Sequence, residues 1–159
     1  MHKIYEDVEY QIDMLGCIVS NLNDKDYTTK GKHISSIGAH VRHTIEYLQI
    51  LIESNLTDTI DYSERKRDQR IETNRLYAKN QLESLKANLW KEDALVYVKE
   101  DGEIYSSSYS REMLYMHEHI VHHSAILKIE LDTLDYLNVD PCFGFAKSTL
   151  KHMESNVSA

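Results

Sequence analysis

A near absence of helix-interrupting residues constrains the fold of this chain more than any other feature. Its 159 residues include one proline, Pro141, and five glycines. Proline removes a backbone donor and clashes with the preceding helical turn, and glycine weakens a helix, so both residues often mark helix ends. Long helices are therefore expected throughout the chain before position 141.

Apolar residues recur at steps of three and four in several segments, which predicts four long helices. Ser35 or Ser36 can cap the second of them. Its buried face is expected to hold Ile37, Val41, Thr44, Leu48 and Ile52, and its solvent-facing strip Arg42, Glu46, Gln49 and Glu53. The residues expected to face inward from the third are Leu76, Gln81 or Leu82, Leu85 and Leu89. The four predicted helices cover residues 4–22, 36–55, 71–89 and 110–136.

The segments between these helices predict how they connect. Residues 23–32 are polar and turn-prone, and residues 57–70 form a charged connection long enough to cross between bundle ends. Asp101-Gly102 lies between β-prone residues of the segment 94–105, a strong hairpin signal. After an irregular stretch at 138–147, a short helix is expected from Ser148. The sequence thus predicts one all-α domain over residues 1–159: a four-helix bundle with a long crossover between helices 2 and 3 and a small β-hairpin before helix 4.

Charge and composition narrow the class of partner and the location. The formal net charge of −8 disfavours nucleic acid and anionic lipid as partners. Acidic residues interrupt the one basic run, at 65–70, which indicates a solvated loop or internal ion pairs. No apolar run has the roughly 18 residues of a membrane span, and the first residues do not resemble a signal peptide, so a cytoplasmic location is expected. Cys17 and Cys142 are expected to be buried, small apolar side chains in a reducing compartment.

Nine histidines are the second unusual feature, and six of them fall into two clusters. On a helix, His119 and His123 project from one face about one turn apart, which is a chelating geometry. The helix at 36–55 can supply a third imidazole from His40 or His43, and a helical wheel slightly favours His40. His117 is expected to be exposed. The alternative is a set of hydrogen-bonded core histidines, but six imidazoles on apolar helices would leave many buried groups unpaired.

These motifs resemble the DinB/YfiT-like superfamily of metal-dependent enzymes. The resemblance rests on the run Ser36-Ile37-Gly38-Ala39-His40-Val41-Arg42-His43, on His119-Ile120-Val121-His122-His123, and on the order of the predicted elements over nearly the whole chain. It implies a bundle in down-up-up-down order that often forms a homodimer, and it assigns the metal ligands to His43, His119 and His123. It also implies thiol-transferase or hydrolase chemistry in some relatives.

Three neutral histidines leave coordination positions open, so this type of site is suited to reaction. The expected cofactor is a divalent transition metal, Zn²⁺ or Ni²⁺ first, and the expected substrate a small molecule. Activated water or a thiolate would be the reactive species of a hydrolase or thiol transferase. A non-catalytic, stress-related metal-binding or ligand-binding bundle is the alternative, followed by a helical interaction protein. Asp61, Tyr62, Arg65, Asp68, Phe143 and Phe145 could line the site, although structural roles are expected first for these residues.

Overall fold

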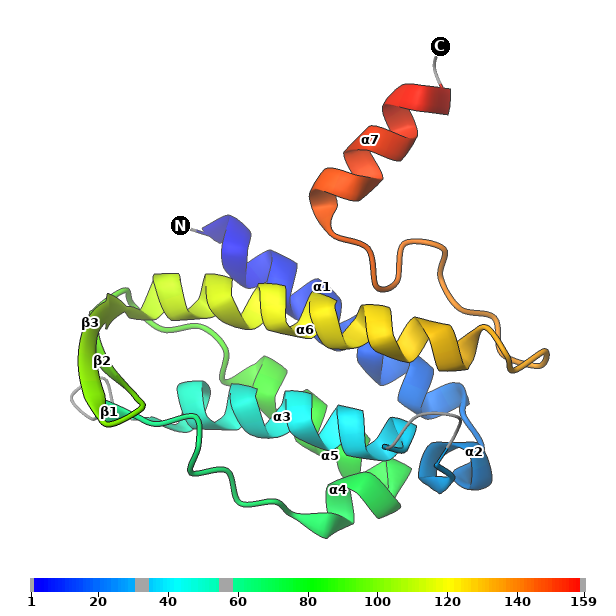
Figure 1. Cartoon of the computed structure of the whole chain (residues 1–159), viewed down its shortest axis with the longest axis horizontal. Coiled ribbons are helices and arrows are strands. Elements are labelled where there is room, and N and C mark those ends of the chain that lie inside the picture. Colours follow the sequence, from blue (N-terminus) through cyan, green and yellow to red (C-terminus); the bar gives the residue numbers. More distant parts are fainter. Residues whose placement is uncertain (1, 31–34, 55–58, 158–159) are drawn as a thin grey trace.

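Four long helices pack in a ring around the core of the computed structural model (Figure 1), which describes residues 2–30, 35–54 and 59–157. They are α1 (His2–Asn21), α3 (Ile37–Glu53), α5 (Arg75–Ala87) and α6 (Tyr109–Leu131). Helix α1 packs against α5 and α6, and α3 packs against the same two helices from the other side. Residues 31–32, 55 and 57–58 of the predicted connections and of the second helix lie outside the described residues.

The core of this ring is aliphatic, with a few aromatic side chains. Its fully buried members come from every long helix and include Val8, Val41, Ile45, Leu48, Leu51, Ala78, Leu82, Met113 and Met116. Burial of such side chains is the main favourable term in folding, at about 1.5–3 kcal/mol for each large apolar residue. The periodic apolar stripes of the sequence therefore do form the core, although Leu76, expected inside, is 69% exposed.

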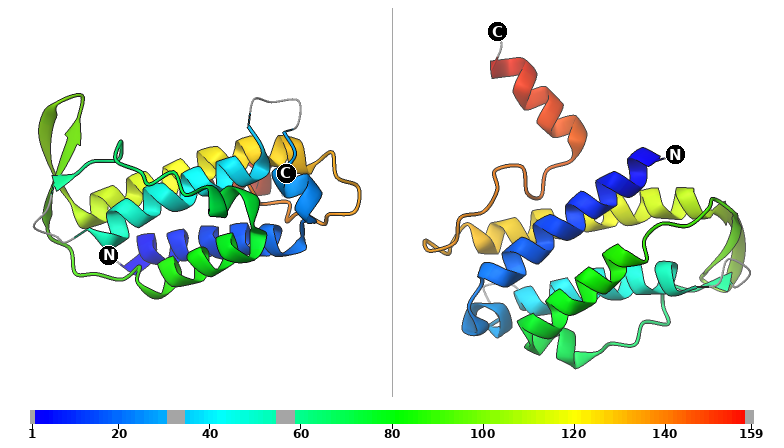
Figure 2. Two further views of the ribbon diagram at one scale, coloured as in Figure 1. Left: turned by 90° about the horizontal axis from the view of Figure 1, so that it is seen from below. Right: turned by 180° about the vertical axis from the view of Figure 1, so that it is seen from behind.

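The segment after α3 runs back along the length of that helix before the next helix begins (Figures 1 and 2). As a result α3 and α5 run in the same direction, while α1 and α6 run in the opposite one. This return path brings the described residues 59–68, which we call the return segment, across the molecule and beside α3. It is the reason why residues of a polar loop reach the candidate site.

The expected all-α class is wrong, because the chain also forms a three-stranded mixed sheet. Strands β2 (Leu95–Glu100) and β3 (Glu103–Ser108) pair antiparallel around the Asp101-Gly102 turn, and β1 (Thr59–Ile60) adds to β2 in parallel. Asp101 and Gly102 both have positive φ angles. Aspartate and glycine tolerate these angles better than most residues, which is why Asp-Gly is common in tight hairpin turns. A strand of two residues is too short to show any period, so β1 was not foreseen.

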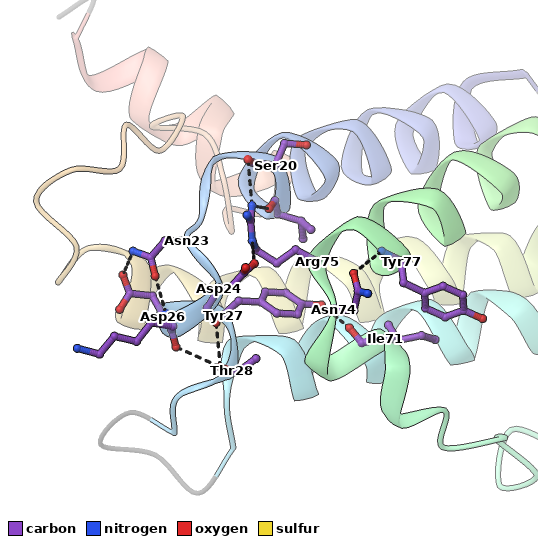
Figure 3. Close-up of polar contacts among 12 residues, drawn as sticks. Ser20, Asn23, Asp24, Asp26, Tyr27, Thr28, Ile71, Asn74, Arg75 and Tyr77 are labelled. Atoms are coloured by element: carbon purple, nitrogen blue, oxygen red, sulfur yellow. Dashed lines mark hydrogen bonds and ion pairs between the residues drawn. The ribbon is translucent and has the colours of Figure 1, made fainter.

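Two short helices, α2 (Asp24–Thr28) and α4 (Gln69–Thr73), were also missed in the sequence. Helix α4 follows the return segment and packs against α3 and α2. Figure 3 shows the contact between the two short helices: the fully buried Tyr27 donates a hydrogen bond of 2.6 Å to the carbonyl oxygen of Ile71. Gly38 allows α4 to approach α3 closely, since a Cβ atom there would lie 2.2 Å from the carbonyl oxygen of Glu72.

Helix boundaries explain the remaining differences from the predicted elements. The single helix expected at 71–89 is divided at Asn74, whose side chain accepts a hydrogen bond from Tyr77 N and so begins α5 as an N-cap. Helix α6 ends at Leu131, five residues before the expected end.

The expectation that the two cysteines are buried is also wrong. Cys17 and Cys142 are both exposed.

The C-terminal helix stands apart from the ring. Helix α7 (Lys147–Val157) extends away from the other helices in Figures 1 and 2. Its first residue, Lys147, reaches back to Asp7 of α1 in an ion pair. Across the described part of the chain, every helix falls short of the combined length and apolar character that crossing a membrane requires.

Candidate metal centre

Helices α3 and α6 lie side by side and run in opposite directions (Figure 1), and they carry the candidate ligands. The side chain of Ser36 caps α3 by accepting a hydrogen bond of 3.1 Å from Ala39 N, and Ser108 caps α6 in the same way from Arg111 N at 3.2 Å. These caps set where each helix begins. They thereby help to place His43 on the face that meets α6, opposite His119.

Three histidines converge where the two helices face each other. His43 comes from α3, and His119 and His123 come from successive turns of α6. The Nε2 atoms of His43 and His119 are 3.1 Å apart, and one ligand atom from each of the three residues lies within 4.8 Å of the others. The three ring centroids are separated by 4.5, 4.7 and 5.0 Å. This three-histidine cluster can hold a metal ion.

The spacing of the nitrogen atoms fits a transition metal. Imidazole nitrogens bind Zn²⁺ at about 2.0–2.1 Å, so two of them at a tetrahedral angle are about 3.3 Å apart. The observed 3.1 Å between His43 and His119 is close to that separation. Little movement of these two rings is therefore required for a shared ion.

The cluster is held in the neutral form that a metal requires. Burial is the main cause that lowers the pKa of His43 and of His119 to about 4 and that of His123 to about 3. The positive charge of Arg65 and the neighbouring histidines lower the pKa of His43 further. Because metal ions bind the deprotonated imidazole, all three nitrogens are available without loss of a proton at neutral pH.

His40 lies beside the cluster and is not one of its three members. Its Nδ1 atom is 3.4 Å from Nδ1 of His123, and the two ring centroids are 5.6 Å apart. A ligating histidine usually donates its second ring N–H to a neighbouring acceptor, and His40 is placed to be that acceptor for His123. The structure therefore favours His43, which the family resemblance implies, over His40, which the helical wheel slightly favoured.

Tyrosine rings form one wall of the cluster. Tyr47 stacks on His119 with a centroid distance of 4.3 Å, and Tyr62 stacks on Tyr47 at 5.4 Å. Tyr115 lies 6.0 Å from His119 and 5.7 Å from Tyr62. These rings cover one side of His119 and bring phenolic hydroxyl groups close to the cluster. Tyr47 was missed in the sequence, although its position four residues after His43 on one helix was a usable signal.

Arg65 brings a positive charge to the same place. Its Nη1 atom contacts Nδ1 of His43, and its Cζ atom lies 4.9 Å from the centroid of the Tyr47 ring. The side chain is half-buried, and its Nε atom is buried without a hydrogen-bond partner in the described structure. Arg65 thus belongs to the site, in contrast to the solvated loop or internal ion pair expected for the basic run.

Two buried carboxylates fix the surroundings of the cluster. Glu46, which was expected to face solvent, is 1% exposed and accepts a hydrogen bond of 2.6 Å from the backbone N of Asp68. Glu112 accepts hydrogen bonds of 2.9 Å from the Tyr62 hydroxyl and 2.6 Å from the Ser107 hydroxyl. Glu46 therefore links the return segment to α3. Glu112 links both the return segment, through Tyr62, and strand β3, through Ser107, to α6.

The other residues singled out in the sequence are not members of the three-histidine cluster. Asp61 pairs with Lys99 at 2.9 Å, Asp68 caps α4, and Phe143 is fully buried in the core. Phe145 lies near Lys128. His117, expected to be exposed, is buried at 5% exposure, whereas His122 is exposed beside His123.

Comparison with known proteins gives no relative from which a role for this site could be inferred. No protein-family model, curated protein or solved structure matches the chain. The assignment of the site rests on the convergence of His43, His119 and His123 on one point between α3 and α6.

Proposed function

We propose that the chain is a cytoplasmic metal-dependent enzyme of hydrolase or thiol-transferase type, in which His43, His119 and His123 bind one divalent transition metal, Zn²⁺ or Ni²⁺ first. The observation that carries the proposal is the convergence of three neutral imidazoles from two helices, with 3.1 Å between the Nε2 atoms of His43 and His119. The resemblance to the DinB/YfiT-like superfamily is part of the same proposal. A small-molecule substrate and a homodimer remain predictions of that resemblance.

The number of ligands and the residues around the cluster are more typical of a catalytic metal site than of a structural one. Structural zinc sites usually have four protein ligands, whereas catalytic sites have three and keep a position open. A divalent ion bound there supplies Lewis-acid activation of water, a carbonyl oxygen or a thiol. His40 orients His123, Tyr47 packs on His119, and Arg65 adds a donor that can reach a bound substrate.

Metal analysis tests the site directly. Protein purified without a histidine tag should contain about one transition metal per chain, since three ligands of one cluster hold one ion. The double variant His119→Ala, His123→Ala should lose that metal, while His152→Ala, which changes an exposed histidine of α7, should keep it. Retention of the metal by the double variant would refute the proposed site.

A turnover screen separates the enzyme from a non-catalytic metal-binding bundle. The metal-loaded protein should be offered esters, amides and low-molecular-weight thiols with electrophilic acceptors. Turnover that disappears on chelation and returns with added metal supports the enzyme. Turnover that chelators leave unchanged would remove the metal from the reaction, and a loaded protein without turnover on any substrate class would favour the binding function.

A further inference from the structure

We propose that Arg65 is the anion-binding residue of the metal centre, so that the substrate carries a small oxyanion, such as a carboxylate, next to the group that meets the metal. This inference rests on the proposed function, because it assigns a substrate class to the same site. It does not follow from the histidine motifs, since Arg65 lies in the return segment between β1 and α4.

The guanidinium group of Arg65 has an unusual environment. It lies over the Tyr47 ring and against His43, and in the described residues no carboxylate is within ion-pair distance of it. Its Nε atom is buried and has no acceptor among those residues. A half-buried guanidinium with five donors and an unfilled donor position favours an external acceptor.

Among the described residues, the side-chain hydrogen-bond partner of Arg65 is His43, which cannot keep that role when it ligates a metal. The Nε2 atom of His43 faces His119, so Nε2 is the atom that would coordinate the ion. A neutral imidazole that coordinates through Nε2 carries its hydrogen on Nδ1. The Nδ1–H and the Arg65 N–H groups would then be two donors facing each other. Loading of the site therefore releases the guanidinium from His43.

The released guanidinium stays near the centre because its backbone is held on both sides. On one side Ile60 is buried and belongs to β1, which pairs with β2. On the other side Asp68 N donates a hydrogen bond of 2.6 Å to the buried Glu46. The Arg65 side chain can therefore turn while its backbone stays in place, and its guanidinium group lies over the Tyr47 ring.

Charge determines what the released group binds. Three neutral histidines leave the two positive charges of the ion uncompensated, and Arg65 adds a third. A planar oxyanion can accept two parallel hydrogen bonds from a guanidinium while it lies beside the ion. The geometry therefore selects substrates with a carboxylate or a similar oxyanion over neutral or cationic ones.

The experiment uses the Co²⁺-loaded protein, because visible absorption of Co²⁺ reports changes at the metal, and acetate as the probe. We compare wild type with Arg65→Gln, Arg65→Lys and the matched control Arg67→Gln, which removes an exposed charge from the same segment. Acetate should bind wild type about tenfold more tightly than Arg65→Gln, because the variant loses hydrogen bonds in which donor and acceptor are both charged. Arg65→Lys should be intermediate, because lysine keeps the charge without the bidentate donor pair, and Arg67→Gln should match wild type.

A second measurement does not depend on the probe. In a chelator competition, Arg65→Gln should bind Zn²⁺ more tightly than wild type, by up to about tenfold, because the donor that opposes the Nδ1–H of His43 is gone. Equal acetate affinity in wild type and Arg65→Gln, with metal bound in both, would overturn the role of Arg65 and leave the metal centre intact. Failure of wild type to bind Co²⁺ would overturn the metal centre itself. If Arg65→Gln does not fold, Arg65→Lys decides: acetate affinity equal to wild type overturns the inference.

Discussion

The contact between α1 and α5 and the contact between α3 and α6 belong to one ring of helices, yet they have opposite characters. The first buries aliphatic side chains such as Ile12, Leu15 and Leu82, each at most 3% exposed. The second combines a fully buried aliphatic face with half-buried histidines such as His43 and His123. Apolar burial stabilises the fold, whereas half-buried polar groups need partners that only a particular geometry supplies. The comparison indicates that the α1–α5 contact mainly stabilises the fold, whereas the α3–α6 contact also holds the candidate metal site.

The largest effect is expected from Leu82→Ala in the α1–α5 contact. The substitution leaves a cavity among fully buried side chains and should lower the unfolding free energy by about 3 kcal/mol. Urea unfolding of the metal-free protein measures this change. The fraction of folded chains that bind metal should stay as in wild type, since no ligand is altered. Metal loss from the folded variant would mean that the two contacts are coupled.

The converse substitution, His43→Ala, should weaken Zn²⁺ binding by about a hundredfold, or about 2.7 kcal/mol, because two histidines remain where three were available. Chelator competition measures the affinity. Unfolding of the metal-free protein should change less than in Leu82→Ala, because His43 is only half-buried. A variant that binds metal as well as wild type would exclude His43 as a ligand, and His40→Ala serves as the comparison.

Acidification should lower the unfolding free energy of the metal-free protein, because the histidines of the α3–α6 contact have lowered pKa values in the folded state. The pKa values of His43 and His119 fall from 6.5 to about 4 on folding, so between these values the unfolded chain binds more protons than the folded one. The unfolding free energy should therefore be constant above about pH 6.5 and fall as the pH drops towards 4. The loss should be on the order of 1 kcal/mol per histidine, because each ring is only partly buried.

A chemical-denaturation series in urea from pH 7.5 to 4.5 measures this slope. The variant His119→Gln, which removes one of the titrating rings, should show a smaller slope than wild type. The reverse result, a protein that becomes more stable as the pH falls through this range, would show that the folded histidines bind protons more readily than free ones.

The smallest effect is expected at the rim of the α1–α5 contact. Lys86 of α5 lies 2.7 Å from Asp13 and 3.5 Å from Glu9 of α1. Lys86→Met keeps the aliphatic stem, so only the ion pairs are lost and stability should decrease slightly at low salt. At about 1 M salt, where charges are screened beyond about 3 Å, wild type and variant should unfold alike. A difference that persists in high salt would show that the methionine side chain packs differently from the lysine it replaces.

Much of the site was predictable from spacing alone. His119 and His123 were paired because residues four apart share a helix face, a local property that needs no knowledge of the fold. Tyr47 follows the same rule relative to His43 and could have been found with it. Arg65 could be named only as one of several candidates for the lining of the site, because a loop has no sequence period from which its path can be predicted.

Several surroundings of the site were not predictable. Glu46 was assigned to solvent from its place among polar residues, yet the return segment covers it and supplies its hydrogen-bond donor. His117 was assigned to solvent and is buried. In both cases a neighbouring segment far along the chain determines exposure, so the local pattern was misleading. Strand β1 exists for a similar reason, since β2 supplies its pairing partner.

The sequence by itself determined the long helices, the turn at Asp101-Gly102 and the chelating pair of histidines, because each depends on contacts within a few residues. The tertiary structure brought His43, and not His40, together with His119 and His123, added the mixed sheet, and placed Arg65 beside these candidate ligands. Those outcomes depend on which helix faces meet and on where the segment after α3 travels. Burial across the whole chain determines both, and the interactions concerned join residues 22 to 83 positions apart.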